Sequence, residues 1–177
     1  PVVYFYLSHA FHQGRPALQL NYVFWYSRRD GPEVPWFERG ALDGLTLRLH
    51  LDPAGAPVLA DVMHTCGCYH ILLPDWRRTA GYTSGPFGLM PLVPAWLPLE
   101  FPARPLRLRV SSGWHQVDRV AAGAGPAAAT VAYSLQPYAR LEALPREGAP
   151  PRSLFDPQGI AVGSQRPENL IFFSMGI

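Results

Sequence analysis

The stretch that decides the fold is Leu45-Thr46-Leu47-Arg48-Leu49-His50-Leu51, in which leucine occupies every second position. Side chains along a β-strand alternate between the two faces of a sheet, so this spacing predicts a strand with one apolar face. The turn that follows is Asp52-Pro53-Ala54-Gly55, whose Asp, Pro and Gly suit the first, second and fourth positions of a type I turn. Because the alternation resumes over residues 58–63, we predict a β-hairpin.

Further segments with the same character lie on both sides of this hairpin. They predict strands over residues 2–10, 18–27, 106–120, 130–138 and 170–174. A second Asp-Pro-x-Gly turn stands at residues 156–159, and helix signals are poor throughout. The pattern therefore predicts an all-β protein of about 7–9 strands, folded as an antiparallel sandwich or a partly open barrel.

Composition sets the class of protein. A chain of 177 residues with 48% hydrophobic and 12% aromatic residues is too apolar for a disordered segment and fits a single β-rich domain over residues 1–177. All 15 basic residues are arginine, and they are scattered at a formal net charge of +2. A nucleic-acid-binding face shows denser clustering of positive charge, so no nucleic-acid partner is expected.

Chemistry is concentrated in His64-Thr65-Cys66-Gly67-Cys68-Tyr69-His70, which holds both cysteines of the chain. Cysteine thiolate and imidazole are preferred ligands of zinc and copper, and Gly67 lets the backbone turn sharply between the two thiols. We therefore predict a metal site formed from His64, Cys66, Cys68 and His70, with a copper or zinc ion as cofactor. Were the strand to continue regularly through the motif, these side chains would point into the core.

Distance limits how many of these residues can hold one ion. A regular strand rises about 3.3 Å per residue, which places residues 64 and 70 roughly 20 Å apart. Either Gly67 makes a tight turn, or Cys66, Cys68 and one flanking histidine form the core of the site, and we favour the second arrangement. The remaining ligands would then come from other histidines, namely His9, His12, His50 or His115.

Several alternatives remain beside the metal site. Cys66 and Cys68 are close enough in sequence for a strained and easily reduced disulfide, or they are small buried hydrophobes. A metalloenzyme with an open coordination position is a further option, whereas the spacing misses the haem-attachment motif by one residue. Ser8 and His9 could belong to a nucleophilic set, but the sequence has no Gly-x-Ser-x-Gly elbow, which argues against a hydrolase. It also has no nucleotide-binding glycine motif, which argues against nucleotide chemistry.

A second candidate surface is the proline-rich stretch of residues 74–105, which contains seven prolines and no sustained periodicity. Irregular connections of this length usually belong to lids or binding loops. The competing hypothesis is thus a non-metal interaction module that docks a protein, glycan or membrane surface through this loop. Trp36, Trp76 and Trp96 are the candidates for a glycan-binding face, because flat apolar rings suit sugar rings.

The motif also carries a resemblance. With residues 42–48 before it and with residues 153–156 and 175–177 after it, residues 61–70 resemble a family of uncharacterised bacterial proteins that share a His-x-Cys-Gly-Cys-Tyr-His signature. The resemblance implies no activity, but members continue past Met-Gly-Ile, so we expect a trimmed chain. The hypothesis from sequence is a metal-binding β-domain of the periplasm or cell envelope, acting in binding or trafficking rather than catalysis.

Overall fold

The protein is all-β, as predicted. The structure, a computed structural model, describes residues 1–12, 14–78, 95–125 and 131–165. Its strands are β1 (Val2–His12), β2 (Arg15–Tyr26), β3 (Asp43–Leu51), β4 (Pro57–His64), β5 (Ile71–Pro74), β6 (Leu106–Val110), β7 (Val117–Ala122), β8 (Ser134–Pro137), β9 (Leu144–Arg146) and β10 (Ala149–Arg152). Two short 3₁₀ helices, η1 (Trp36–Glu38) and η2 (Tyr138–Ala143), complete the described part.

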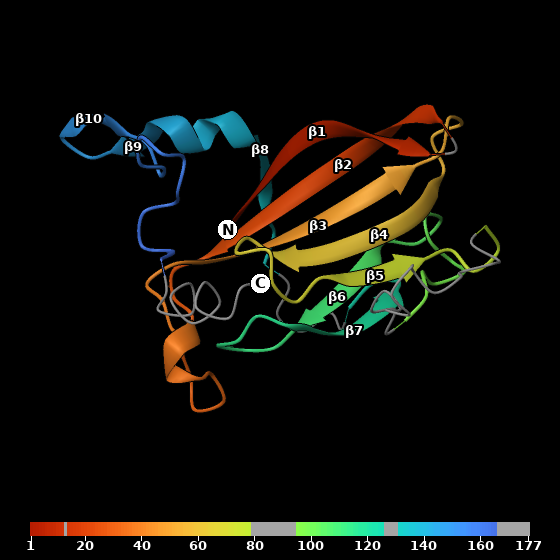
Figure 1. The fold of residues 1–177 in the computed structure, drawn as a ribbon, viewed down its shortest axis with the longest axis horizontal. Coiled ribbons are helices and arrows are strands. Elements are labelled where there is room, and N and C mark those ends of the chain that lie inside the picture. The colour runs from red at the N-terminus through yellow and green to blue at the C-terminus, as the bar shows by residue number, and fades with distance from the viewer. Residues whose placement is uncertain (13, 79–94, 126–130, 166–177) are drawn as a thin grey trace.

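The main sheet has six strands in the order β5-β4-β3-β2-β1-β8. Strands β1 to β5 pair antiparallel with their neighbours in sequence, whereas β8 joins the edge parallel to β1. The β6-β7 hairpin lies over the end of the sheet that carries β4 and β5, and β9-β10 forms a separate small ribbon (Figure 1). The arrangement is an open two-layer sandwich, since the sheet does not close into a barrel.

The core lies between the sheet and the β6-β7 hairpin. The predicted hairpin is confirmed, with Leu47 opposite Val62 and a turn closed by a 2.9 Å bond from the Gly55 N–H to the Asp52 carbonyl. Leu45, Ala60, Val62, Leu73 and Leu97 are buried in one cluster, and apolar residues of β6 and β7 pack against it. The alternating leucines therefore face the core, and Arg48 and His50 face the other side of the sheet.

Three details differ from the sequence prediction. The strand expected over residues 106–120 is two strands, because the chain reverses through Ser111-Ser112-Gly113, where Gly113 adopts φ +77°. β8 covers only part of the segment expected over residues 130–138, and its pairing is parallel rather than antiparallel. The strand expected at residues 170–174 lies outside the described residues. Across the part of the chain that the structure describes, no helix has the length and apolarity that a membrane span requires.

Candidate functional site

The His/Cys motif forms a turn that leaves the end of β4. The strand stops at His64, and the loop closes on itself through bonds from Gly67 N–H to the His64 carbonyl (2.8 Å) and from His64 N–H to the Cys68 carbonyl (3.1 Å). Gly67 and Tyr69 have φ of +86° and +52°, left-handed values that end regular strand geometry. As a result only His64 is buried, whereas Cys66 is exposed, so the alternation expected through the motif is broken.

The turn brings three of the four predicted ligands together. A ring nitrogen of His64 and the sulfur atoms of Cys66 and Cys68 all lie within 4.8 Å of one another. The two sulfur atoms are joined as a disulfide, with the Cα atoms 5.5 Å apart. His70 lies elsewhere, with its Nε2 atom 3.2 Å from Oδ1 of Asp61. The group is close enough to hold a metal ion, and the cysteines are in their oxidised form.

Both ring nitrogens of His64 have hydrogen-bond partners. Nδ1 lies 2.7 Å from a guanidinium nitrogen of Arg29, and Nε2 lies 3.2 Å from the backbone oxygen of His115. A guanidinium only donates and a carbonyl only accepts, so Nδ1 is the acceptor and Nε2 carries the proton. His64 is thus held as one neutral tautomer, and a metal at either nitrogen has to replace one of these partners.

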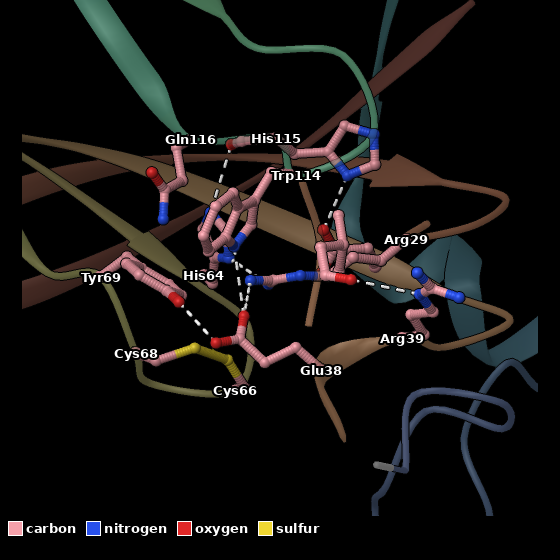
Figure 2. A network of polar contacts seen from close by, with 12 residues as sticks. Arg29, Glu38, Arg39, His64, Cys66, Cys68, Tyr69, Trp114, His115 and Gln116 are labelled. Carbon is pink, nitrogen blue, oxygen red and sulfur yellow. Dashed lines mark hydrogen bonds and ion pairs between the residues drawn. A yellow bond between two sulfur atoms is a disulfide. The ribbon is translucent and has the colours of Figure 1, made fainter. Parts of the chain in front are cut away.

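Behind His64 lies a buried ionic cluster. Arg29, whose side chain is 0% exposed, forms an ion pair with Glu38 and lies 3.7 Å from Oδ1 of Asp43. Figure 2 shows its guanidinium linked to both His64 and Glu38. A charge this deep is tolerated only when it is paired and hydrogen bonded. The cluster therefore fixes the position of the imidazole beside the two cysteines.

Aromatic side chains complete the cluster. Tyr69 donates to Glu38 (2.6 Å) and Trp114 donates to the other oxygen of that carboxylate (3.1 Å). Burial and the hydrogen bond to Glu38 raise the pKa of Tyr69, so the phenol keeps the proton that it donates. His115 bonds to Asp43 at 2.7 Å and stacks on Tyr26 with ring centroids 3.9 Å apart. The disulfide loop is therefore anchored to the cluster through Tyr69.

A second polar network lies on the opposite face of the sheet. Asp61, with a side chain 3% exposed, accepts two 3.0 Å bonds from Arg48 and further bonds from His50 and His70. The chain continues from His50 to Gln19 (3.0 Å) and from Gln19 to the hydroxyl of Ser8 (2.8 Å). Ser8 donates to an amide oxygen and not to an imidazole. The loop is thus anchored on this face as well, through His70.

Acid should remove part of the stability that Asp61 provides. Burial alone would raise the pKa of the Asp61 carboxyl, but hydrogen bonds from His50 and Arg48 lower it from 3.8 to about 2. A pKa depressed in the folded state gives stability that is complete above pH ~4 and is lost as the pH falls towards ~2. We expect a loss of about 2 kcal/mol over that interval, measured by urea unfolding at several pH values. In Asp61→Asn this part of the pH dependence should be absent; an unchanged acid profile in the variant would contradict the assignment.

The remaining predicted ligands do not join the cysteines in the described structure. His50 is bound to Asp61, His115 is bound to Asp43, and His9 is exposed. The side chain of His12 and residues 79–94 of the proline-rich loop lie outside the described residues. Trp36, Trp76 and Trp96, the candidates for a glycan face, are 69%, 53% and 50% exposed.

Sequence reasoning missed the residues that hold His64. Arg29 stood in an ordinary Arg-Arg pair, and Glu38 stood in a segment with no periodicity, so neither carried a signal. Comparisons with protein-family models, with curated proteins and with solved structures find no match to this chain.

Proposed function

We propose that the reduced protein binds one copper or zinc ion through His64, Cys66 and Cys68, and that the disulfide is the metal-free form of the same site. The observation that carries the proposal is the group of three donor atoms within 4.8 Å of one another. Thiolates bound to a tetrahedral ion through bonds of about 2.3 Å are roughly 3.8 Å apart. Only a small movement of the exposed loop is needed to reach that geometry.

Reduction must come before metal binding, because thiolates and not disulfides are the ligands. Two electrons and two protons convert the disulfide to two thiols, and Cu(I) or Zn(II) then displaces the thiol protons. His64 must also release either Arg29 or the His115 carbonyl to offer a lone pair. Metal binding is therefore coupled to a rearrangement around the buried arginine, which remains paired with Glu38.

The proposed role is binding or trafficking in the periplasm or cell envelope. Three protein ligands leave a fourth position for a donor from another molecule, which suits transfer of the ion. The exposure of Cys66 gives such a donor access to the ion. A cysteine pair at rest as a disulfide fits an oxidising compartment. These features support the proposed location and role.

The test is metal stoichiometry in the two redox states. Anaerobically reduced protein should bind about one equivalent of Cu(I) or Zn(II), and oxidised protein should bind much more weakly. Cys66→Ser should lower affinity by more than the roughly 10–100-fold typical of losing an outer hydrogen-bond partner of a ligand. Absorption bands from thiolate to metal, read with Co(II) or Cu(I), report the ligand set directly.

His70→Gln is the matched control for this experiment. His70 belongs to the same motif but bonds to Asp61 on the other face, so its replacement should leave affinity and stoichiometry unchanged. Equal binding by reduced and oxidised protein would contradict the proposal. So would an affinity that depends on His70 rather than on the cysteines. Circular dichroism confirms that each variant is folded.

A thiol–disulfide exchange module without metal is the second candidate. The disulfide itself favours this function. So do the hydrogen bonds of His64, because both ring nitrogens are already bonded within the protein. The same titration separates the two functions. Reduced protein that takes up no metal but cycles reversibly between dithiol and disulfide supports the second.

A further inference from the structure

A cleft lies on the face of the sheet opposite the core, and the disulfide loop forms part of its wall. Its volume is about 500 Å³, within the range of small-molecule sites. Its lining includes Tyr6 and Met63 from the sheet, together with Tyr138, Phe155 and residues shortly after Phe155. Cys66 lines the same cleft and is exposed. A molecule bound here would lie beside one sulfur of the disulfide.

The chemistry of the lining selects the ligand. Three aromatic rings adjoin one another, with centroids 5.3 Å apart for Tyr6 and Tyr138 and 5.8 Å apart for Tyr138 and Phe155. Among the described residues that line the cleft there is no Asp, Glu, Lys or Arg. A charged ligand would lose hydration without gaining an ionic partner, whereas a flat apolar group gains contact with the rings.

We infer that the cleft binds a thiol carrying a flat apolar group, and that this thiol opens the disulfide by forming a mixed disulfide with Cys66. The inference rests on the proposed function in that the same two cysteines must be reduced before they hold a metal. It names the class of reductant that the site accepts. A small molecule fits the cleft volume, and Cys66, an exposed residue that lines the cleft, supplies the reacting sulfur.

The reaction is balanced by two equivalents of the thiol. The first thiolate attacks the Cys66 sulfur, the bond between the two cysteines breaks, and Cys68 leaves as a thiolate. Cys68 lies within 4.8 Å of a ring nitrogen of His64, which accepts a hydrogen bond from Arg29. A second thiolate then attacks the sulfur of the bound thiol, and Cys66 leaves as a thiolate. The two thiols depart joined as a small-molecule disulfide, and the two electrons they have lost remain on Cys66 and Cys68.

The experiment compares three thiols on oxidised, chelator-treated protein: phenylmethanethiol, 2-mercaptoethanol and glutathione. Opening of the disulfide is followed by acid quench and mass spectrometry, and an oxidised Thr-Cys-Gly-Cys-Tyr peptide gives the intrinsic reactivity of each thiol. Relative to the peptide, phenylmethanethiol should open the protein disulfide at least ~10-fold faster than either polar thiol. Its rate should saturate with concentration, and peptide mapping should place the trapped adduct on Cys66.

Two exposed apolar residues, two positions apart in the chain, provide the matched variants. Ile160 is 44% exposed and lines the cleft, whereas Val162 is 50% exposed and does not. Ile160→Asn should remove most of the preference for phenylmethanethiol, and Val162→Asn should retain it. A preference equal to that of the peptide, an adduct on Cys68, or equal effects of the two variants would overturn the inference.

The outcome is distinguishable from that of the metal proposal. The thiol kinetics are measured without metal, and the metal titration uses protein reduced by an unrelated phosphine. Loss of the thiol preference with intact metal binding removes the cleft inference alone. Loss of metal binding with an intact thiol preference removes the metal function alone.

Discussion

Arg29→Ala should lower the free energy of unfolding by about 3–5 kcal/mol. The side chain of Arg29 is 0% exposed, and its removal leaves the buried Glu38 without its ionic partner. The substitution also removes the hydrogen bond that Arg29 donates to Nδ1 of His64. It opens a cavity beside the ring of Tyr69, whose centroid lies 5.3 Å from the guanidinium carbon. Urea unfolding at neutral pH measures the change.

The control for this prediction is Arg109→Ala. Arg109 makes a two-bond ion pair with Asp118, but the arginine side chain is 69% exposed. Solvent screens exposed pairs of this kind, so they contribute little to stability, and the two arginine variants should differ severalfold in effect. Similar losses for both would show that Arg29 does not carry the buried cluster.

Gly113→Ala should cost about 3 kcal/mol. Gly113 lies between β6 and β7 at φ +77°, and a methyl group there would lie 2.1 Å from the backbone oxygen of Asp30. A left-handed backbone conformation lowers stability by about 1–2 kcal/mol for any residue with a side chain. The clash lowers it further, because one of the two backbone segments has to move. Because this contact joins the turn of the hairpin to the segment before Gly31, the variant should also disturb His115 and Arg29. Unfolding curves and the NMR signal of the His115 ring provide the measurement.

Gly55→Ala isolates the backbone contribution. Gly55 has φ +83° but nothing lies within 4 Å of the added methyl group. Its cost should be about 1 kcal/mol, the penalty for the left-handed conformation alone. If the two glycine variants lose the same free energy of unfolding, the close approach of the hairpin turn to Asp30 does not contribute to stability.

Local patterns predicted the fold class and the central hairpin because both depend on alternation along single strands. Leu45, Leu47 and Leu49 face the core as their spacing requires. The turn at Gly113 was missed because apolar residues recur on both sides of Ser111-Ser112-Gly113 and suggest one continuous strand. Which strand lies beside β1 depends on contacts between distant segments, so the parallel pairing of Val2 with Ser134 had no local signal.

The candidate site was likewise predicted only where local sequence was enough. The sequence indicated His64, Cys66 and Cys68, since ligand types crowded into seven residues are visible without a structure. It could not choose between His64 and His70, because that choice depends on where β4 ends and on the left-handed turn at Tyr69. The ionic partners of His64 come from segments whose proximity only the tertiary fold creates. Asp61 belongs to a strand that the sequence predicted, but its burial could not be predicted. It became evident only in the structure, where Arg48 and His50 both pair with its carboxylate.

The parallel pairing at the sheet edge has a consequence for synthesis of the chain. Strands β1 to β5 follow one another in sequence, so each can pair with its predecessor as it leaves the ribosome. β8 supplies the outer neighbour of β1, and the first pair joins Val2 to Ser134. β1 therefore emerges before the other strands of the sheet and gains its outer neighbour after all of them have been made. Throughout that interval its outer backbone groups are open to strands of other nascent chains, so crowding on a polysome favours misfolding at this edge.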